Sequence, residues 1–373
     1  MIEEEKVARL NDNFEQISST FSSTIDWETF EKRLISSTKL FSFKEIGSFR
    51  NCDPLDTSSQ IISSIEIDKS GGIFATAGVL KQIKLYKLDT AIAAQTRRSY
   101  PILEIKCDSK ISCLSWNPFY EERLGSADYE GIVNLYDTQT GKSLNSWTEH
   151  EKRCWSIDTS ALDPQRILSG SDDSKVKLWS QKSQKSLLTL DIRSNVCSAR
   201  FCPIDSNVIA VGAADHRVFL FDLRKPSIPI LNEKRHTKAV SYVRFSGTDR
   251  LISASTDSSL RSWNITPKSD QIVFKGHVNE KNFVGLSIDS SEGLIATGSE
   301  DNSVYIYDGI LNSPVLKCPM LTQCPLTGTP MEDEQSAFVS SVTWANQFDE
   351  DGNPILLAAN STGNIKIFSI ISE

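Results

Sequence analysis

The sequence predicts an all-β protein, a seven-bladed β-propeller that follows a short N-terminal helical segment. A strand pattern that ends in an aromatic residue occurs seven times, at Tyr86, Tyr136, Trp179, Phe221, Trp263, Tyr307 and Phe368. The steps between successive endings are 50, 43, 42, 42, 44 and 61 residues. A period of about 40 to 45 residues with four short strands per unit is typical of WD repeats, so the seven endings indicate seven WD-repeat blades.

Residues 1–58 lie outside the repeat, and we expect them to form an N-terminal helical extension. Leu10, Phe14, Ile17 and Phe21 have helical spacing. Asp26 can cap a second short helix. These helices would pack on the propeller or close it, and the alternative is that they bind a partner. The propeller itself is expected to occupy residues 59–373.

Blade three shows the strand pattern of one repeat clearly. Residues 154–159 alternate between apolar and polar, residues 166–171 form the next strand, and residues 176–179 follow a polar turn. Blade five repeats this pattern at residues 240–245, 250–255 and 260–263. Each of these blades is therefore expected to form consecutive antiparallel strands joined by tight turns.

The turns and strand entries of the blades carry recurrent polar residues. A carboxylate stands six residues before the final aromatic at Glu130, Asp173, Asp215, Asp257 and Asp301. Three of the four histidines, His150, His236 and His277, lie 27 to 30 residues before a final aromatic. The resemblance to WD repeats implies that each histidine joins a hydrogen-bonded network with the turn aspartate, the tryptophan and a strand serine such as Ser156 or Ser241. Because these positions recur with the blades, the role we expect for them is structural.

The last blade is preceded by a long connection, which we place at residues 311–338. It contains four prolines and the acidic run at residues 331–334. Long connections without secondary structure are uncommon in compact domains, so we expect a mobile insertion here.

Composition and missing motifs exclude several classes of function. With 40 basic and 48 acidic residues, the net charge of −8 argues against direct binding of nucleic acid or of an anionic membrane. The eight cysteines include no Cys-x-x-Cys pair, so neither a metal nor a cofactor is expected. The chain also lacks a nucleophile elbow, a metalloprotease motif and a phosphate-binding loop. We therefore expect a protein that is not an enzyme.

Comparison of the blades isolates positions that depart from the repeat. Lys110, Arg153, Lys238 and Glu280 lie 25 to 27 residues before the final aromatic, at the entry to the innermost strand, and should ring one face. Twenty-four residues before that aromatic, Trp155 and Phe283 stand where other blades have Ser112, Cys197 and Ala239. Tyr129 occupies the adjoining turn of blade two.

Aromatic anchors surrounded by charges at the mouth of a propeller fit a short peptide with an apolar core and an acidic flank. Three alternatives remain open. The two aromatics fill gaps between blades, the protein is a scaffold, or the propeller uses its central channel as a small-ligand binder or enzyme.

The stretches that contain these positions resemble a known family. They include Ile111-Ser-Cys-Leu-Ser-Trp-Asn, Asp128-Tyr-Glu-Gly-Ile-Val, Glu149-His-Glu-Lys-Arg-Cys-Trp-Ser and Asn279-Glu-Lys-Asn-Phe-Val-Gly. From about residue 60 onward the chain resembles the WD-repeat domain of the constitutive photomorphogenic E3 ubiquitin ligases. That family binds Val-Pro motifs of transcription factors, photoreceptors and signalling adaptors on its top face. The resemblance assigns this role to Lys110, Tyr129, Arg153, Trp155, Lys238, Glu280 and Phe283.

Full-length members of that family also carry a RING finger and a coiled coil. Here no cysteine precedes Cys52, so the chain is similar in layout to the short repressors of UV-B photomorphogenesis. The resemblance implies a substrate receptor or regulator in ubiquitin-dependent degradation, in the nucleus and cytoplasm. The alternative is a scaffold that competes with a full-length homologous ligase for its ligands.

A short box at the end of blade four suggests a second partner. Phe221-Asp-Leu-Arg224 resembles the Trp/Tyr-Asp-x-Arg box with which WD-repeat receptors dock on the adaptor of cullin-based ligases, except that phenylalanine stands first. Asp222 and Arg224 are the candidate docking residues. The alternative is a plain strand end in which Arg224 pairs with a neighbouring carboxylate.

Overall fold

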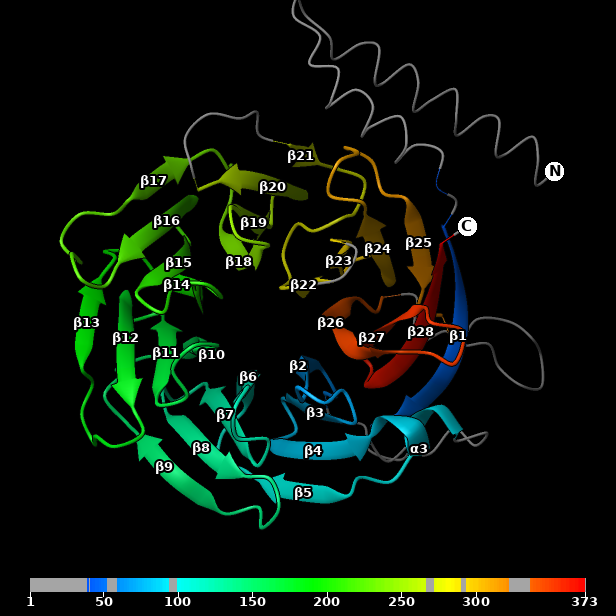
Figure 1. Cartoon of the computed structure of the whole chain (residues 1–373), viewed down its shortest axis with the longest axis horizontal. Helices are drawn as coiled ribbons and strands as arrows, with labels where there is room; N and C mark the ends of the chain where they lie inside the picture. The colour runs from blue at the N-terminus through cyan, green and yellow to red at the C-terminus, as the bar shows by residue number, and fades with distance from the viewer. Residues whose placement is uncertain are drawn as a thin grey trace, which may run out of the picture.

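The computed structural model describes residues 39, 41–51, 59–93, 99–265, 272–289, 293–321 and 336–372. Within these residues, the strands form seven four-stranded antiparallel sheets, arranged as blades around a central axis (Figure 1). This arrangement confirms the predicted seven-bladed propeller. In blades one to six, the first strand in the sequence is innermost and the fourth is outermost.

The strands have the following bounds. Blade one contains β2 (Ile62–Ile67), β3 (Ile73–Gly78), β4 (Gln82–Lys87) and β5 (Leu103–Lys106). Blade two contains β6 (Ile111–Trp116), β7 (Arg123–Asp128), β8 (Val133–Asp137) and β9 (Ser143–Trp147). Blade three contains β10 (Cys154–Thr159), β11 (Arg166–Ser171), β12 (Lys175–Ser180) and β13 (Leu188–Asp191). Blade four contains β14 (Val196–Phe201), β15 (Val208–Ala213), β16 (Arg217–Asp222) and β17 (Leu231–Lys234).

The remaining blades complete the ring. Blade five contains β18 (Val240–Ser246), β19 (Arg250–Ser255), β20 (Ser259–Asn264) and β21 (Val273–Phe274). Blade six contains β22 (Leu286–Ile288), β23 (Ile295–Thr297), β24 (Ser303–Tyr307) and β25 (Leu316–Pro319). Blade seven contains β26 (Val339–Phe348), β27 (Pro354–Asn360), β28 (Asn364–Ser372) and β1 (Phe41–Arg50). The strands that we expected in blades three and five from the sequence are confirmed.

The ring is closed by β1, the strand from the beginning of the chain. It pairs antiparallel with β28 and is the outer strand of blade seven (Figure 1). The predicted domain boundary at residue 59 is therefore wrong for residues 41–50, which belong to the propeller. The three C-terminal strands of blade seven leave an unpaired edge that β1 covers. The helices predicted around Leu10, Phe14, Ile17, Phe21 and Asp26 lie outside the described residues.

Two shorter elements were not expected from the sequence. Helix α3 (Leu88–Ala93) follows β4, and its Leu88 and Ala91 are buried in the apolar core shared with Phe49 of β1. Strand β25 pairs with β24 as the outer strand of blade six, so the predicted insertion at 311–338 begins too early. Residues 322–335 of that insertion lie outside the described part of the chain.

Serine hydroxyls on the inner strands join neighbouring blades. In each case a backbone N–H of one inner strand donates to a serine Oγ of another, at 2.9 to 3.2 Å: Leu114 to Ser64, Thr159 to Ser115, Ala199 to Ser156, Val243 to Ser198, Trp344 to Ser287 and Ile65 to Ser341. These contacts fix the inner strands around the channel, where the candidate site lies.

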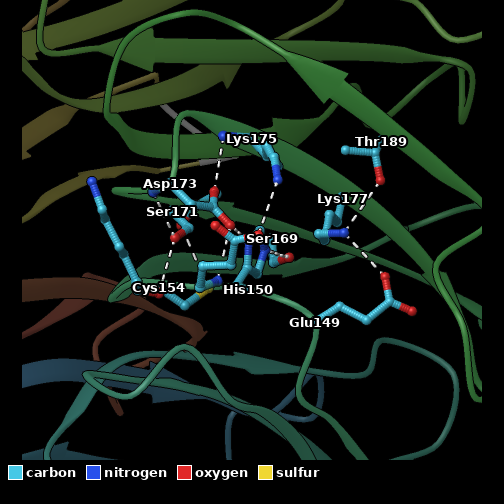
Figure 2. Close-up of polar contacts among 12 residues, drawn as sticks. Glu149, His150, Cys154, Ser169, Ser171, Asp173, Lys175, Lys177 and Thr189 are labelled. Carbon is cyan, nitrogen blue, oxygen red and sulfur yellow. Dashed lines mark hydrogen bonds and ion pairs between the residues drawn. The ribbon is translucent and has the colours of Figure 1, made fainter.

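The histidine network forms in blade three with a different serine from the one expected. His150 Nδ1 lies 2.7 Å from the Asp173 carboxylate and Nε2 lies 2.7 Å from Ser169 Oγ (Figure 2). Trp179 Nε1 donates to the same hydroxyl at 2.8 Å. The chemistry fits a neutral imidazole that donates to the carboxylate and accepts from the hydroxyl. Ser156 takes no part in this network. Ser169 lies on β11, next to β12, and there it contacts both His150 and Trp179.

Blade five repeats this network and blade six does not. His236 lies between Asp257 and Ser253, at 3.0 and 2.7 Å, so the expectation for Ser241 was also wrong. In blade six, His277 Nδ1 lies 2.9 Å from the Tyr307 hydroxyl, while Asp301 accepts from Tyr305 and Lys317. The expected pairing of His277 with the turn aspartate is therefore absent from the described contacts. Tyr307 at the end of β24 replaces the tryptophan that completes the network in blades three and five.

We expect Ser169→Ala to lower the free energy of unfolding by about 1–3 kcal/mol, because it leaves both His150 Nε2 and Trp179 Nε1 buried without a partner. Urea unfolding followed by circular dichroism measures the loss. The matched control is Ser126→Ala at the same register of blade two, where Cys107 replaces the histidine and Tyr136 the tryptophan. Equal losses in the two variants would contradict the structural role of the network.

Candidate functional site

A cavity of about 300 Å³ occupies the central channel. Its lining comes from the inner strand of every blade, β2, β6, β10, β14, β18, β22 and β26, from the segment that precedes β22, and from the turn between β7 and β8. Three of the predicted site residues, Tyr129, Trp155 and Phe283, are among those that line it. A volume of this size is at the lower end of the range for small-ligand pockets.

Four aromatic side chains meet at this cavity, and we call them the aromatic cluster: Tyr129, Trp155, Tyr242 and Phe283. The Trp155 ring centroid lies 5.4 Å from that of Tyr129 and 5.1 Å from that of Phe283. Phe283 in turn lies 6.2 Å from Tyr242. All four side chains are half-buried, so the cluster offers apolar surface to an incoming ligand.

The position of Trp155 follows from an irregularity shared by the inner strands. The pairing register shifts around Trp155, and it shifts at the same place around Ser63, Ser112, Cys197, Ser241 and Ser340. A bulge of this kind re-aims the side chain of the extra residue. Blade three is the blade with an aromatic at this bulge. The residue of blade five that is structurally equivalent to Trp155 is Ser241. The sequence comparison, which had placed Ala239 there, was therefore off by two residues.

Trp155 and Phe283 contact each other directly across the channel. They belong to blades three and six, and their rings meet edge to face at an interplanar angle of 64°. No space for an apolar side chain remains between two rings at this distance. A bound peptide would therefore contact the outer faces of the pair or separate the two rings.

Two backbone features hold the flanking aromatics in place. The turn with Tyr129 contains Gly131 at φ 84°, where an added Cβ would lie 2.5 Å from the Lys152 carbonyl oxygen. Glycine thus lets this turn approach the entry of blade three, where Trp155 lies. On the other side, Glu300 Oε1 accepts from the backbone N–H groups of Lys281 and Asn282, at 2.8 and 2.7 Å. These bonds hold the irregular segment that carries Phe283.

The electrostatics of these groups follow from burial and nearby donors. Burial raises the pKa of the Tyr129 hydroxyl, although the charge of Arg153 opposes this shift. Burial alone would also raise the pKa of Glu300, but hydrogen bonds from the Phe283 segment lower it. Glu300 is therefore ionised at neutral pH. Glu300 was not selected from the sequence, because Asp172 of blade three is a carboxylate at the same turn position.

The four predicted charged residues are exposed at the strand entries. The Arg153 guanidinium lies 5.2 Å from the centre of the Tyr129 ring, within the range of a cation–π contact. The Lys110 carbonyl accepts from the Tyr129 N–H at 3.0 Å. Lys238 Nζ donates to the Glu280 carbonyl oxygen at 3.3 Å. Lys110 and Arg153 are thus brought next to the aromatic cluster, and Lys238 is brought next to Glu280.

Asp222 and Arg224 lie at the other end of their blade. Strand β16 starts beside the turn at Asp215, which corresponds to the Tyr129 turn, and it ends at Asp222 on the opposite rim. Arg224 Nε is 2.8 Å from Asp222 Oδ1, and Arg224 Nη2 is 3.5 Å from Asp205 Oδ2. The Arg224 side chain is nevertheless 61% exposed. Arg224 thus forms the ion pairs with neighbouring carboxylates that were the alternative to adaptor docking. Docking of an adaptor stays a prediction.

Two further properties concern the part of the chain that the structure describes. No helix among them is long and apolar enough to cross a membrane. No group of three or more His, Cys, Asp or Glu side chains in the same part of the chain could hold a metal ion.

Comparison with known proteins identifies the family. The family described as "WD domain, G-beta repeat" matches residues 141–180, 228–264 and 268–308. "WD repeat-containing protein RUP1" of Arabidopsis thaliana is 35% identical over 322 residues, which cover 84% of this chain and 81% of that protein. The chain belongs to the family of WD-repeat proteins that includes RUP1. The predicted resemblance is confirmed.

Larger members of this family are also similar to the chain. "E3 ubiquitin-protein ligase COP1" of Pisum sativum is 41% identical over 91% of the chain and 49% of its own length. "Protein SUPPRESSOR OF PHYA-105 1" of Arabidopsis thaliana is 37% identical over 97% of the chain and 35% of its own length. The chain thus spans about half or less of the length of these two relatives.

Proposed function

We propose that this protein is a non-catalytic receptor for peptides with a Val-Pro core and an acidic flank, and that it acts in ubiquitin-dependent protein degradation. The observation that carries the proposal is the aromatic cluster at the mouth of the channel. Aromatic side chains that are partly exposed in a concave site are the usual anchors of peptide and protein interfaces. Valine and proline offer compact apolar surfaces that can pack on such rings.

The charges around the cluster support an acidic flank. Lys110, Arg153 and Lys238 are exposed at the strand entries of blades two, three and five. Their positive potential would attract a negatively charged segment and orient it during association. Glu280 lies beside Lys238 and would pair with a basic or backbone donor of the ligand.

The link to degradation rests on the relationship to COP1, which is described as an E3 ubiquitin-protein ligase. A peptide-binding propeller can serve a ligase as its substrate receptor, and it can equally compete with a full-length homologous ligase for transcription factors or signalling adaptors. Docking of a cullin-ligase adaptor through Asp222 and Arg224 would favour the first role. We place this activity in the nucleus and cytoplasm.

Fluorescence polarisation with a labelled acidic Val-Pro peptide tests the proposal. We expect the purified full chain to bind it with micromolar or tighter affinity. The matched control is the same peptide with Val-Pro replaced by Ala-Ala, which keeps the acidic flank and should bind at least tenfold more weakly. Failure of the folded protein to bind the Val-Pro peptide, or equal binding of both peptides, would refute the proposal.

Charge reversal at Lys238 should act mainly on the association rate. We expect Lys238→Glu to slow association severalfold at low salt and to make the rate less dependent on salt, because the steering potential falls. Stopped-flow fluorescence at several salt concentrations measures both effects. Lys185→Glu, an equal charge change at an exposed position after β12, is the control and should resemble the wild type. Indistinguishable salt dependence in the two variants would remove Lys238 from the site.

A further inference from the structure

Below the aromatic cluster, the seven inner strands present a polar residue at one common register. These residues, which we call the polar belt, are Glu66, Ser115, Asp158, Arg200, Arg244, Ser287 and Thr343. In each blade whose inner strand has a bulge, the polar residue stands three positions after the bulged residue. Such a ring of polar side chains inside a propeller is not needed for the apolar cores, which lie within and between the blades.

One charged pair of the polar belt is well satisfied. Arg200 Nη1 lies 2.9 Å from Asp158 Oδ1, and the backbone N–H of Phe201 donates to Asp158 Oδ2 at 2.7 Å. Burial opposes the charge of Arg200, but Asp158 and other nearby groups raise its pKa overall. Arg200 Nε is buried and has no hydrogen-bond partner among the described residues. This arginine is therefore a fixed cation whose Nε–H has no acceptor among the described residues.

The second pair is incomplete. Arg244 Nη2 is 3.8 Å from Glu66 Oε1, which is too far for a hydrogen bond. Within the described residues, the hydrogen bond recorded for its guanidinium runs from Nε to the Leu286 carbonyl oxygen at 3.3 Å. The Arg244 side chain is 23% exposed, and it faces the cavity together with Glu66. Its terminal donors are thus open to the channel.

This end of the channel holds two arginines and two carboxylates, but only Arg200 forms a close ion pair with its carboxylate. Burial and the positive charge of Arg200 lower the pKa of Arg244, so two guanidinium groups repel each other there. Burial also raises the pKa of Glu66, which makes its negative form less favourable. Arginine stays protonated in proteins, so Arg244 keeps its positive charge, which Glu66 at 3.8 Å offsets without a hydrogen bond.

We propose that the polar belt binds a small organic or inorganic oxoanion, a carboxylate or a phosphate, through the free guanidinium donors of Arg244 with Arg200 adding positive potential. A guanidinium binds both groups through two parallel hydrogen bonds. The cavity of about 300 Å³ has room for about ten waters at about 30 Å³ each, and citrate fits such a space. This site lies deeper in the same cavity as the proposed peptide site, and oxoanion binding is measured without the peptide.

Isothermal titration calorimetry of the full chain in Tris-chloride, with inorganic phosphate and with citrate as separate probes, tests the proposal. We expect the wild type to bind at least one probe with a Kd of about 1 mM or below. Phosphate binding alone would identify a phosphate site, and citrate binding alone would identify a carboxylate site. Arg244→Gln should weaken binding at least tenfold.

The control is Arg217→Gln on β16, whose side chain is 40% exposed and pairs with Asp215 outside the channel. It should bind within twofold of the wild type. Absence of binding of both probes to the folded wild type would overturn the proposal. Unchanged binding in Arg244→Gln, or an equal loss in Arg217→Gln, would overturn it too.

A second variant changes affinity in the opposite direction and keeps the test decisive if Arg244→Gln does not fold. Glu66→Gln removes the negative charge that faces Arg244 while it preserves the size of the side chain. We expect it to tighten binding of the same probe at least threefold. Unchanged or weaker binding by folded Glu66→Gln would contradict the role of Arg244.

Discussion

Replacing Trp155 with alanine is expected to weaken binding of the Val-Pro peptide by at least about 30-fold, or about 2 kcal/mol. Trp155 links the members of the aromatic cluster, because its ring contacts both Tyr129 and Phe283. Its removal deletes the largest apolar surface at the mouth and also leaves Phe283 without its partner across the channel. Fluorescence polarisation with the peptide described above measures the loss.

The control for this variant is Phe119→Ala. Phe119 is 49% exposed and lies between β6 and β7, at the rim away from the aromatic cluster. We expect this variant to bind the peptide as the wild type does. Circular dichroism establishes that both variants are folded. A loss of less than fivefold in folded Trp155→Ala would remove Trp155 as the anchor of the site.

The second large effect concerns closure of the ring. We expect Phe49→Ala to lower the free energy of unfolding by about 3–5 kcal/mol, as truncation of a buried phenylalanine does. Phe49 belongs to the outer strand of blade seven, yet its ring lies 5.2 Å from Tyr86 and 6.3 Å from Phe74 of blade one. It is 3% exposed. The residue thus joins the last blade to the first.

Phe43→Ala in the same strand is the matched control. Phe43 is 37% exposed, and its ring meets Phe368 edge to face at 5.7 Å. Loss of one such partly exposed contact should cost about 1 kcal/mol. Urea unfolding of both variants gives the comparison. If Phe49→Ala cost no more than Phe43→Ala, β1 would not hold the first and last blades together.

The inner strands of the blades could be predicted because they are nearly fully buried and recur at a constant period. The outer strands are more exposed, and their patterns are weaker: β17 alternates between half-buried and exposed residues. For the same reason β1 and β25 were assigned to other segments. Strand β1 also pairs with a strand at the far end of the chain, and no local signal in residues 41–50 reveals that partner.

The candidate site was predicted in part. Trp155 and Phe283 were found because the other blades supply an internal reference for each position. Tyr242, Glu300 and the polar belt were missed. Tyr242 and Arg244 are ordinary alternating residues of β18, and nothing local shows that they face a cavity. The serine of the histidine network was assigned to the wrong strand because sequence spacing does not show which strand lies beside the tryptophan.

By itself, the sequence determined that the chain forms seven repeated blades and which blades depart from the repeat, because hairpins depend on residues close together in the chain. The tertiary structure decided which of the residues that depart from the repeat come into contact with one another. Closing the ring through β1 and β28 places blade three opposite blade six, so that Trp155 contacts Phe283, and brings Arg244 of blade five to Glu66 of blade one. Contacts across a channel depend on the curvature of the whole ring, and no single repeat encodes that curvature.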